Sequence, residues 1–273
     1  MTARIPVVTA LAEFRVAIAG LPFQAQPADD PTGAIVVVDG SGRWWDAAAI
    51  AVGAGASAVL VAEPREVPLD AVGDLAEHAD VPIVVHRSRL RHDLLGLAVE
   101  QREGVAPRVV VSECRATGTR LPQLVRDAVG WMRGLAETPL TVAAAAATSD
   151  GGTALLRSRI DDRVVGSMLT TATRREGTFL RVQALGETTT EFELDEPAGR
   201  SELSTSTSRG RLVAPARYEA GERAALRRAV ESVVEQRLPR DLAHLLHDAE
   251  AAFAIVPFVL DSRSLVDIGL KNA

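Results

Sequence analysis

The 273-residue sequence predicts an α/β protein in which a small parallel sheet precedes an α+β domain with a large, mainly antiparallel open sheet. In the first half, apolar strand-length runs alternate with helix-length segments over short connections, which is typical of parallel strands joined by right-handed crossovers. After residue 138, strand-length segments with alternating apolar and polar residues follow one another, separated by turn residues. That pattern indicates antiparallel strands with one face left for solvent or a partner.

Each element of the parallel part is predicted by an apolar run or an apolar stripe bounded by glycine or proline. The expected strands are FRVAIAG at 14–20, GAIVVVDG at 33–40, AVLVAE at 58–63, VPIVVHRS at 81–88 and APRVVVSECRA at 106–116. The expected helices are 44–55, 68–80, 90–104 and 120–135. Together with the change of pattern, these segments predict one domain at 1–115 and a second at 116–273.

The second domain is predicted to contain five strands, a polar and mobile loop, and two closing helices. The strands are expected at 139–149, 153–161, 164–175, 178–187 and 188–197, the loop at 198–216, and the helices at 219–238 and 241–262. Two helices cannot cover both faces of such a sheet, so we expect an exposed apolar face that binds a second copy or a relative of the chain. Alternate residues of a strand point to opposite faces, and the sequence leaves open which set points outward. The candidate outward positions include Leu156, Val165, Met168, Phe179, Val182 and Phe192.

The composition argues against several classes of function. The net charge of −6 and the pI of about 5.5 argue against binding to nucleic acid or to anionic membranes. The single Cys114 excludes an intrachain disulfide and fits a cytoplasmic location. Because the one lysine, Lys271, is third from the end, Schiff-base chemistry and a phosphate-loop lysine are excluded from the body of the fold. No apolar segment is long enough to span a bilayer, and Glu13 and Arg15 interrupt the early apolar stretch that a signal peptide would need.

The sequence lacks the features by which a dinucleotide cofactor is usually held. The usual fingerprint is G-x-G-x-x-G between the first strand and the first helix. After the strand expected at 14–20, Gly20 stands alone and three prolines oppose a following helix. No second strand is expected, and therefore no acidic residue to hold a ribose. We expect no cofactor and no metal site, since His244 and His247 lack a further ligand nearby.

Read in order, these segments resemble the Gfo/Idh/MocA family of sugar-type dehydrogenases over about residues 33–260. The course of 33–64 is similar to the family's path from strand four to a strand ending in Glu-Lys-Pro, with Ala62, Glu63 and Pro64 at that motif. Arg89 lies near a position where members often carry arginine. The resemblance implies a Rossmann-like first domain, here truncated by about one βαβ unit, and a C-terminal domain that commonly associates through its sheet.

The departures from the family pattern fall on its chemistry. Members use the lysine of Glu-Lys-Pro to contact the nicotinamide and substrate, whereas Glu63 stands there with the opposite charge. When the family's Asp-x-x-x-His-x-x-Asp pattern is aligned on Asp127, Arg120 and Leu124 replace its first aspartate and its proton-transferring histidine. The resemblance therefore implies a degenerate member that has lost hydride-transfer chemistry.

Four residues form the candidate cleft, namely Glu63, Asp127, Arg89 and Arg120. Glu63 and Asp127 could serve as general acid and base if burial separates their pKa values, with the arginines nearby. In the alternative interpretation, Glu63 is a solvated or arginine-paired acid in a disused cleft.

Three functions remain open at this point. The leading hypothesis is an oxidoreductase-like protein without NAD(P)-dependent dehydrogenase activity, which acts as a non-catalytic or regulatory partner. The second is a cofactor-independent lyase, isomerase or hydrolase that acts on a sugar-like substrate through Glu63 and Asp127. The third is an oxidoreductase whose cofactor binds unconventionally, and it rests on fold analogy alone.

Overall fold

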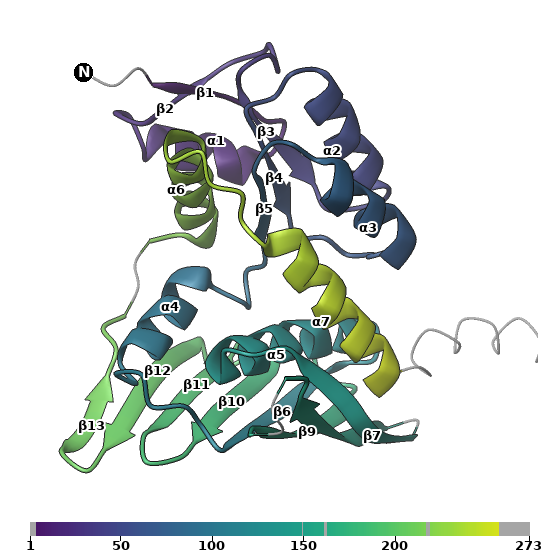
Figure 1. The fold of residues 1–273 in the computed structure, drawn as a ribbon, viewed down its shortest axis with the longest axis vertical. Helices are drawn as coiled ribbons and strands as arrows, with labels where there is room; N and C mark the ends of the chain where they lie inside the picture. Colours follow the sequence, from purple (N-terminus) through teal and green to yellow (C-terminus); the bar gives the residue numbers. More distant parts are fainter. Residues whose placement is uncertain (1–3, 149, 161–162, 217–218, 257–273) are drawn as a thin grey trace, which may run out of the picture. The chain divides into compact units, whose positions relative to one another are not determined.

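The computed structural model describes residues 4–148, 150–160, 163–216 and 219–256. The chain forms two compact units (Figure 1). Unit 1 contains residues 1–91 and 217–247, and unit 2 contains residues 92–216 and 248–273. This division differs from the boundary expected at 115/116, because residues 92–115 belong to unit 2 and the chain returns to unit 1 with a helix after the large sheet. The strand expected at 106–116 is therefore part of the sheet of unit 2 and not of the parallel sheet.

Unit 1 is built on a five-stranded parallel sheet with the strand order β2-β1-β3-β4-β5. Its strands are β1 (Ile5–Val8), β2 (Ala25–Pro27), β3 (Ile35–Asp39), β4 (Ala58–Ala62) and β5 (Ile83–His86). Its helices are α1 (Ala12–Ala19), α2 (Trp44–Gly53), α3 (Leu69–His78), α6 (Gly221–Val234) and the start of α7 (Asp241–Ile255). The expected Rossmann-like parallel sheet is thus confirmed.

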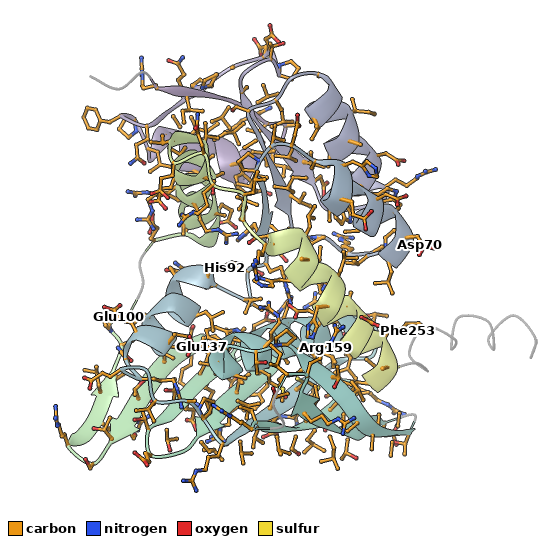
Figure 2. The ribbon with its side chains drawn as sticks, viewed as in Figure 1. Asp70, His92, Glu100, Glu137, Arg159 and Phe253 are labelled. Carbon is orange, nitrogen blue, oxygen red and sulfur yellow. The ribbon has the colours of Figure 1, made fainter. Side chains whose placement is uncertain are left out.

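Different helices cover the two faces of this sheet, because successive side chains along a strand point to opposite faces. Leu60 and Phe14 belong to one buried layer, formed with α1 and α6. Val59 and Trp44 belong to the other, formed with α2, α3 and the start of α7. Side chains fill both layers (Figure 2). Every residue of β4 is buried, which explains why its sequence is apolar throughout.

The segment 14–20, expected as the first strand, is helical, and that prediction is wrong. The first strand is Ile5–Val8, and Phe14, Ala17 and Ile18 are buried on one side of α1. Their spacing fits a one-sided helix, and a short apolar run alone does not distinguish that helix from a strand. A second strand, Ala25–Pro27, follows and pairs in parallel with β1, although none was expected.

Unit 2 is built on an eight-stranded sheet with the order β13-β12-β11-β10-β6-β9-β8-β7, in which β6 and β9 pair in parallel and the other neighbours antiparallel. Its strands are β6 (Val109–Thr117), β7 (Leu140–Thr148), β8 (Gly151–Ser158), β9 (Val165–Thr173), β10 (Phe179–Leu185), β11 (Thr189–Asp195), β12 (Arg200–Thr207) and β13 (Gly210–Val213). Its helices are α4 (His92–Glu100), α5 (Leu121–Ala136) and the end of α7. The expected large, mainly antiparallel sheet is confirmed.

Helix α5 packs on one face of this sheet (Figure 1). Trp131 stacks on Phe192 with ring centroids 4.1 Å apart, and Arg133 forms a buried ion pair with Asp248 at 2.8 Å. Among the described residues of unit 2, no helix lies over the opposite face, which we call the open face (Figure 1). None of the helices in the described part of the chain is long and apolar enough to cross a membrane.

Two expectations for this sheet need correction. The segment 198–216, expected as a mobile loop, contains the hairpin of β12 and β13, and Leu203 and Thr205 of β12 are buried. Of the expected outward positions, Val165 and Phe179 lie on the open face, whereas the others are buried on the face covered by α5. The buried positions are Leu156, Met168, Val182 and Phe192.

Candidate functional site

The candidate site lies at the carboxyl edge of the parallel sheet in unit 1. Because all five strands run in the same direction, their carboxyl ends share one edge, where α/β sheets usually bind ligands. Glu63 directly follows β4, and His86 is the last residue of β5. The backbone N–H of Glu63 donates to the carbonyl oxygen of His86 over 2.9 Å. The two side chains therefore start from neighbouring strands at the same level.

The turn after β3 is held tightly against the end of β4. The Gly40 N–H donates to the Ala62 carbonyl oxygen over 2.7 Å, and the Arg65 N–H donates to the Gly40 carbonyl oxygen over 2.9 Å. A Cβ at position 40 would lie 2.4 Å from backbone atoms of Ala62, Glu63 and Pro64, so this approach requires glycine. Glu63 itself has a left-handed backbone with φ of 53°. These contacts fix the point from which the Glu63 side chain leaves the sheet.

His86 lies between two carboxylates from different elements. Its Nε2 is 3.6 Å from Oε1 of Glu63 and 3.7 Å from Oε1 of Glu222, which stands in the first turn of α6. The Phe14 ring meets the imidazole edge-on, and the His86 side chain is buried. Glu63 also accepts a hydrogen bond from the backbone N–H of Ser88. We call Glu63, His86 and Glu222 the carboxylate–histidine cluster; it joins β4, β5 and α6.

The carboxylate–histidine cluster changes the acidity of one of its members. The imidazole of His86, as a donor and as a charge, lowers the pKa of Glu222 to about 2, against the opposing effect of partial burial, and Arg91 acts in the same direction. The Glu222–His86 distance is longer than an ordinary hydrogen bond, and the contact is an ion pair only when His86 is protonated. A carboxylate this acidic stays ionised near neutral pH and cannot serve there as a general acid. Within the described ranges, no group of three or more side chains could hold a metal ion.

The turn that would hold a dinucleotide pyrophosphate lies between β1 and α1, from Thr9 to Leu11. It contains no glycine, and Thr9 Oγ1 accepts a hydrogen bond from the Leu11 N–H over 3.1 Å, which occupies one amide of the turn. Glu13, in the first turn of α1, places a negative charge where a helix N-terminus would otherwise attract phosphate. These residues do not fit a pyrophosphate.

An acidic pair after β2 is the part of a dinucleotide site that sequence reasoning missed. Asp29 and Asp30 follow the carboxyl end of β2, where dinucleotide-binding sheets place the acid that holds a ribose. Asp30 Oδ1 accepts a hydrogen bond from the Thr32 N–H over 2.9 Å, which lowers the pKa of Asp30. The pair was missed because the first strand was assigned to 14–20, which left no place for a second strand before β3.

The four residues predicted for the cleft are divided between the units. Glu63 and Arg89 belong to unit 1, whereas Arg120 and Asp127 belong to unit 2. Arg89 is half-buried, Arg120 is exposed just before α5, and Asp127 is buried within α5. Burial raises the pKa of the Cys114 thiol, and the charge of Asp127 adds to that effect. The pairing of Glu63 with Asp127 stays a prediction.

Comparison with known proteins gives matches only at the level of structure. No protein-family model matches the chain, and no curated protein matches it. A dehydrogenase from Chromobacterium violaceum is 13% identical, with a TM-score of 0.71 over 100% of both chains. UDP-N-acetylglucosamine 3-dehydrogenase from Acidithiobacillus ferrooxidans is 14% identical, with a TM-score of 0.66 over 94% of this chain and 98% of that chain. KijD10, a 3-ketoreductase from Actinomadura kijaniata solved with NADP and TDP-benzene, is 12% identical, with a TM-score of 0.62 over 93% of this chain and 97% of that chain.

The chain shares the fold of these oxidoreductases. At such low identity the likeness shows the fold alone, and it is in keeping with the Gfo/Idh/MocA resemblance of the sequence. Whether this chain also carries the chemistry of these enzymes depends on its own residues at the carboxyl edge.

Proposed function

We propose that the chain is an oxidoreductase-like protein of the Gfo/Idh/MocA type that lacks NAD(P)-dependent dehydrogenase activity and acts as a non-catalytic or regulatory partner. The turn from Thr9 to Leu11 carries this proposal, because it combines the absence of glycine with the charge of Glu13 at the helix N-terminus. The described residues also include no lysine, so no ammonium group stands beside Glu63. The free, buried Cys114 is in keeping with a cytoplasmic protein.

An activity assay tests this proposal against a structural neighbour with a known substrate. The chain is incubated with UDP-N-acetylglucosamine and NAD or NADP, while the absorbance of the reduced nicotinamide is followed. The UDP-N-acetylglucosamine 3-dehydrogenase from Acidithiobacillus ferrooxidans serves as the positive control. We expect no reduction above the enzyme-free blank, and turnover that scales with the concentration of the chain would refute the proposal.

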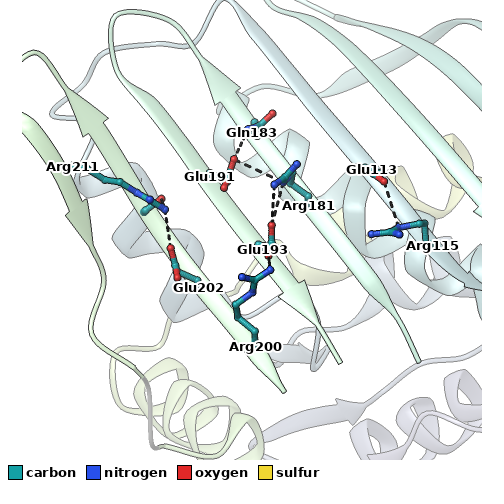
Figure 3. Close-up of polar contacts among 10 residues, drawn as sticks. Glu113, Arg115, Arg181, Gln183, Glu191, Glu193, Arg200, Glu202 and Arg211 are labelled. Atoms are coloured by element: carbon teal, nitrogen blue, oxygen red, sulfur yellow. Dashed lines mark hydrogen bonds and ion pairs between the residues drawn. The ribbon is translucent and has the colours of Figure 1, made fainter. Parts of the chain in front are cut away.

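The partner role is supported by the open face of the eight-stranded sheet. Leu155, Val165 and Leu169 are exposed and lie on this face of β8 and β9. On β6 and on the strands beyond it (β10 to β13), by contrast, the open face carries charged residues that already pair with one another (Figure 3). The part of the open face over β8 and β9, which we call the apolar half, carries one charged side chain, Arg157 beside Val165. It is therefore the part that a partner would dehydrate with least cost.

The charged residues on the open face of β10 to β13, which we call the charged half, form ion pairs with one another. Arg181 contacts Glu193 at 3.1 Å, and Glu193 also pairs with Arg200 (Figure 3). Arg211 pairs with Glu202 at 2.8 Å (Figure 3). Because each of these charges already has a partner of opposite sign on a neighbouring strand, this half needs no counter-charge from a second chain. We propose that a second copy packs on the apolar half, so that the dimer forms through the C-terminal sheet.

The substitution Leu169→Arg tests this interface. Leu169 is 47% exposed on the open face, and an arginine there would place a long charged side chain, beside Glu113 of β6, within the proposed dimer interface. The matched control is Leu212→Arg, because Leu212 is 56% exposed on the same sheet but pairs with Thr205, whose side chain points to the opposite face. Light scattering after size exclusion should show the mass halved for Leu169→Arg and unchanged for Leu212→Arg. A wild-type mass of 28.9 kDa would reject self-association.

A second candidate function is a cofactor-independent lyase, isomerase or hydrolase acting on a sugar-like ligand. One observation favours it: Glu63 and His86 meet at the edge where α/β sheets bind ligands, and such a pair can exchange a proton. NMR of UDP-N-acetylglucosamine incubated with the chain would reveal new resonances if this function were present. Glu63→Gln should then abolish them, and their persistence in that variant would exclude Glu63 as the catalytic residue.

A further inference from the structure

On the face of the parallel sheet that carries α2 and α3, α2 covers only one side of strand β3. A hollow of about 440 Å³ runs along this strand beside α2. Val36 and Val38 form its floor, and α2 forms its wall with Ala47, Ile50 and Ala54. The hollow is therefore apolar beside Val36 and Val38 and polar after the end of β3, where Asp39, Ser41 and Arg43 line it.

The hollow exists because the connection from β2 to β3 contains no helix. Only residues 28–34 separate these two strands. Since Val7 belongs to the layer formed with α1, its neighbours Pro6 and Val8 point to the side of the hollow, where both are half-buried. The layer formed with α2 and α3 includes no residue of β1 among those described. Parallel sheets normally carry helices on both faces, so one helix position is vacant here.

Helix α2 itself is apolar on the side that should meet solvent. Among its ten residues, Asp46 carries the one charge. Its exposed positions are Ala47, Ala49, Ile50 and Gly53. Ile50, which is 72% exposed, stands at the rim of the hollow. A helix that is apolar all round is normally buried on all sides.

We propose that a second copy of the chain covers this face, with α2 of each copy seated in the hollow of the other. The protruding Ile50 and the hollow lie side by side on one surface, so the surface is its own complement, as a two-fold interface requires. The sizes agree, because α2 is about 15 Å long and β3 about 17 Å. The charged residues that line the hollow are one of each sign, Asp39 and Arg43, and Arg43 also pairs with Asp46 of the same chain at 2.6 Å.

The substitution Ile50→Arg tests the interface through the mass of the assembly. The matched control is Val16→Arg, because Val16 is 73% exposed on α1, in the same unit but outside the hollow. Sedimentation equilibrium at micromolar concentration should show the mass halved for Ile50→Arg and unchanged for Val16→Arg. A wild-type monomer, or an Ile50→Arg variant with the wild-type mass, would overturn the proposal. A small ligand or another protein as the natural occupant of the hollow would give this second result.

The two proposed interfaces fail in distinguishable ways. If both exist, the wild-type assembly has more than two chains, Ile50→Arg and Leu169→Arg each give two, and the double variant gives one. If the sheet interface is wrong, Leu169→Arg leaves the mass unchanged while Ile50→Arg still halves it.

Cross-linking adds a readout that does not depend on disrupting the surface. A cysteine at Ala47, which lines the hollow, should cross-link two copies through a short bis-maleimide, whereas a cysteine at the exposed Ala49 outside the hollow should not. Equal cross-linking of both variants, or none of Ala47→Cys, would also overturn the proposal.

Discussion

Replacing Gly40 with alanine should destabilise the chain by about 2 to 6 kcal/mol. The added Cβ would lie 2.4 Å from backbone atoms of Ala62, Glu63 and Pro64. Because carbon contacts are relaxed only near 3.5 Å, the turn after β3 and the end of β4 must separate by about 1 Å. That movement breaks the backbone hydrogen bonds of Gly40 with Ala62 and Arg65, worth about 0.5–1.5 kcal/mol each, and packing strain adds about 1–3 kcal/mol.

Urea unfolding of the variant and the wild type under identical conditions measures this loss. The matched control is Gly73→Ala in the interior of α3, where an added Cβ meets nothing within 4 Å. Alanine is the better helix former, so the control should gain about 0.5–1 kcal/mol. If Gly40→Ala stayed within about 0.5 kcal/mol of the wild type, the close approach that positions Glu63 would be refuted.

Three further predictions concern charged and reactive groups. The urea midpoint of Glu222→Gln should lie furthest below that of the wild type at pH 5 and above, and closest to it near pH 2. The reason is that a carboxyl with a lowered pKa stabilises the fold above its ordinary pKa, and this contribution is lost as the pH falls from about 4.5 to about 2. A difference in urea midpoint that is constant over this range would contradict the prediction. Cys114 should react with a thiol reagent far more slowly in the native chain than in urea, since burial raises its pKa, and rapid stoichiometric labelling of the native chain would speak against this. Asp248→Ala should cost about 3–5 kcal/mol by leaving the Arg133 guanidinium in a buried site, and a loss below about 1 kcal/mol in urea unfolding would show that solvent reaches it.

The fold could be predicted where burial is the same on both sides of an element. The strand β4 is enclosed by helices on both faces, so its sequence is apolar from Ala58 to Ala62 and indicates a parallel strand. The helix α1 is enclosed on one side only, and its short apolar stretch was assigned to a strand. The first strand is Ile5–Val8. With that strand in place, the second strand and the acidic pair that follows it can be assigned.

The hairpin of β12 and β13 was missed for a different reason. Its serines and threonines are typical of a loop, yet Thr205 is buried in the sheet. The hydroxyl of Thr205 donates to Oε1 of Gln101 over 2.9 Å, which satisfies it inside the protein. Since that partner lies far away in the sequence, no local pattern could indicate that the segment is buried.

The candidate site was predictable only in part. The position of Glu63 followed from the end of a strand, because parallel strands present their carboxyl ends at one edge. Its contact with His86 depends on the pairing of β4 with β5, and the contact of His86 with Glu222 depends on the return of α6 to unit 1. Contacts of that kind are set by the tertiary fold and have no signature in residue spacing.

Titration of the purified chain with NADH and NADPH tests most directly whether the turn after β1 excludes a dinucleotide. Tryptophan fluorescence and calorimetric heat are followed together, since Trp44 and Trp45 follow the carboxyl end of β3 on the sheet edge where a cofactor would lie. We expect neither signal to saturate at physiological cofactor concentrations. Saturable binding of either cofactor in the micromolar range would contradict the proposal that this chain lacks dehydrogenase chemistry.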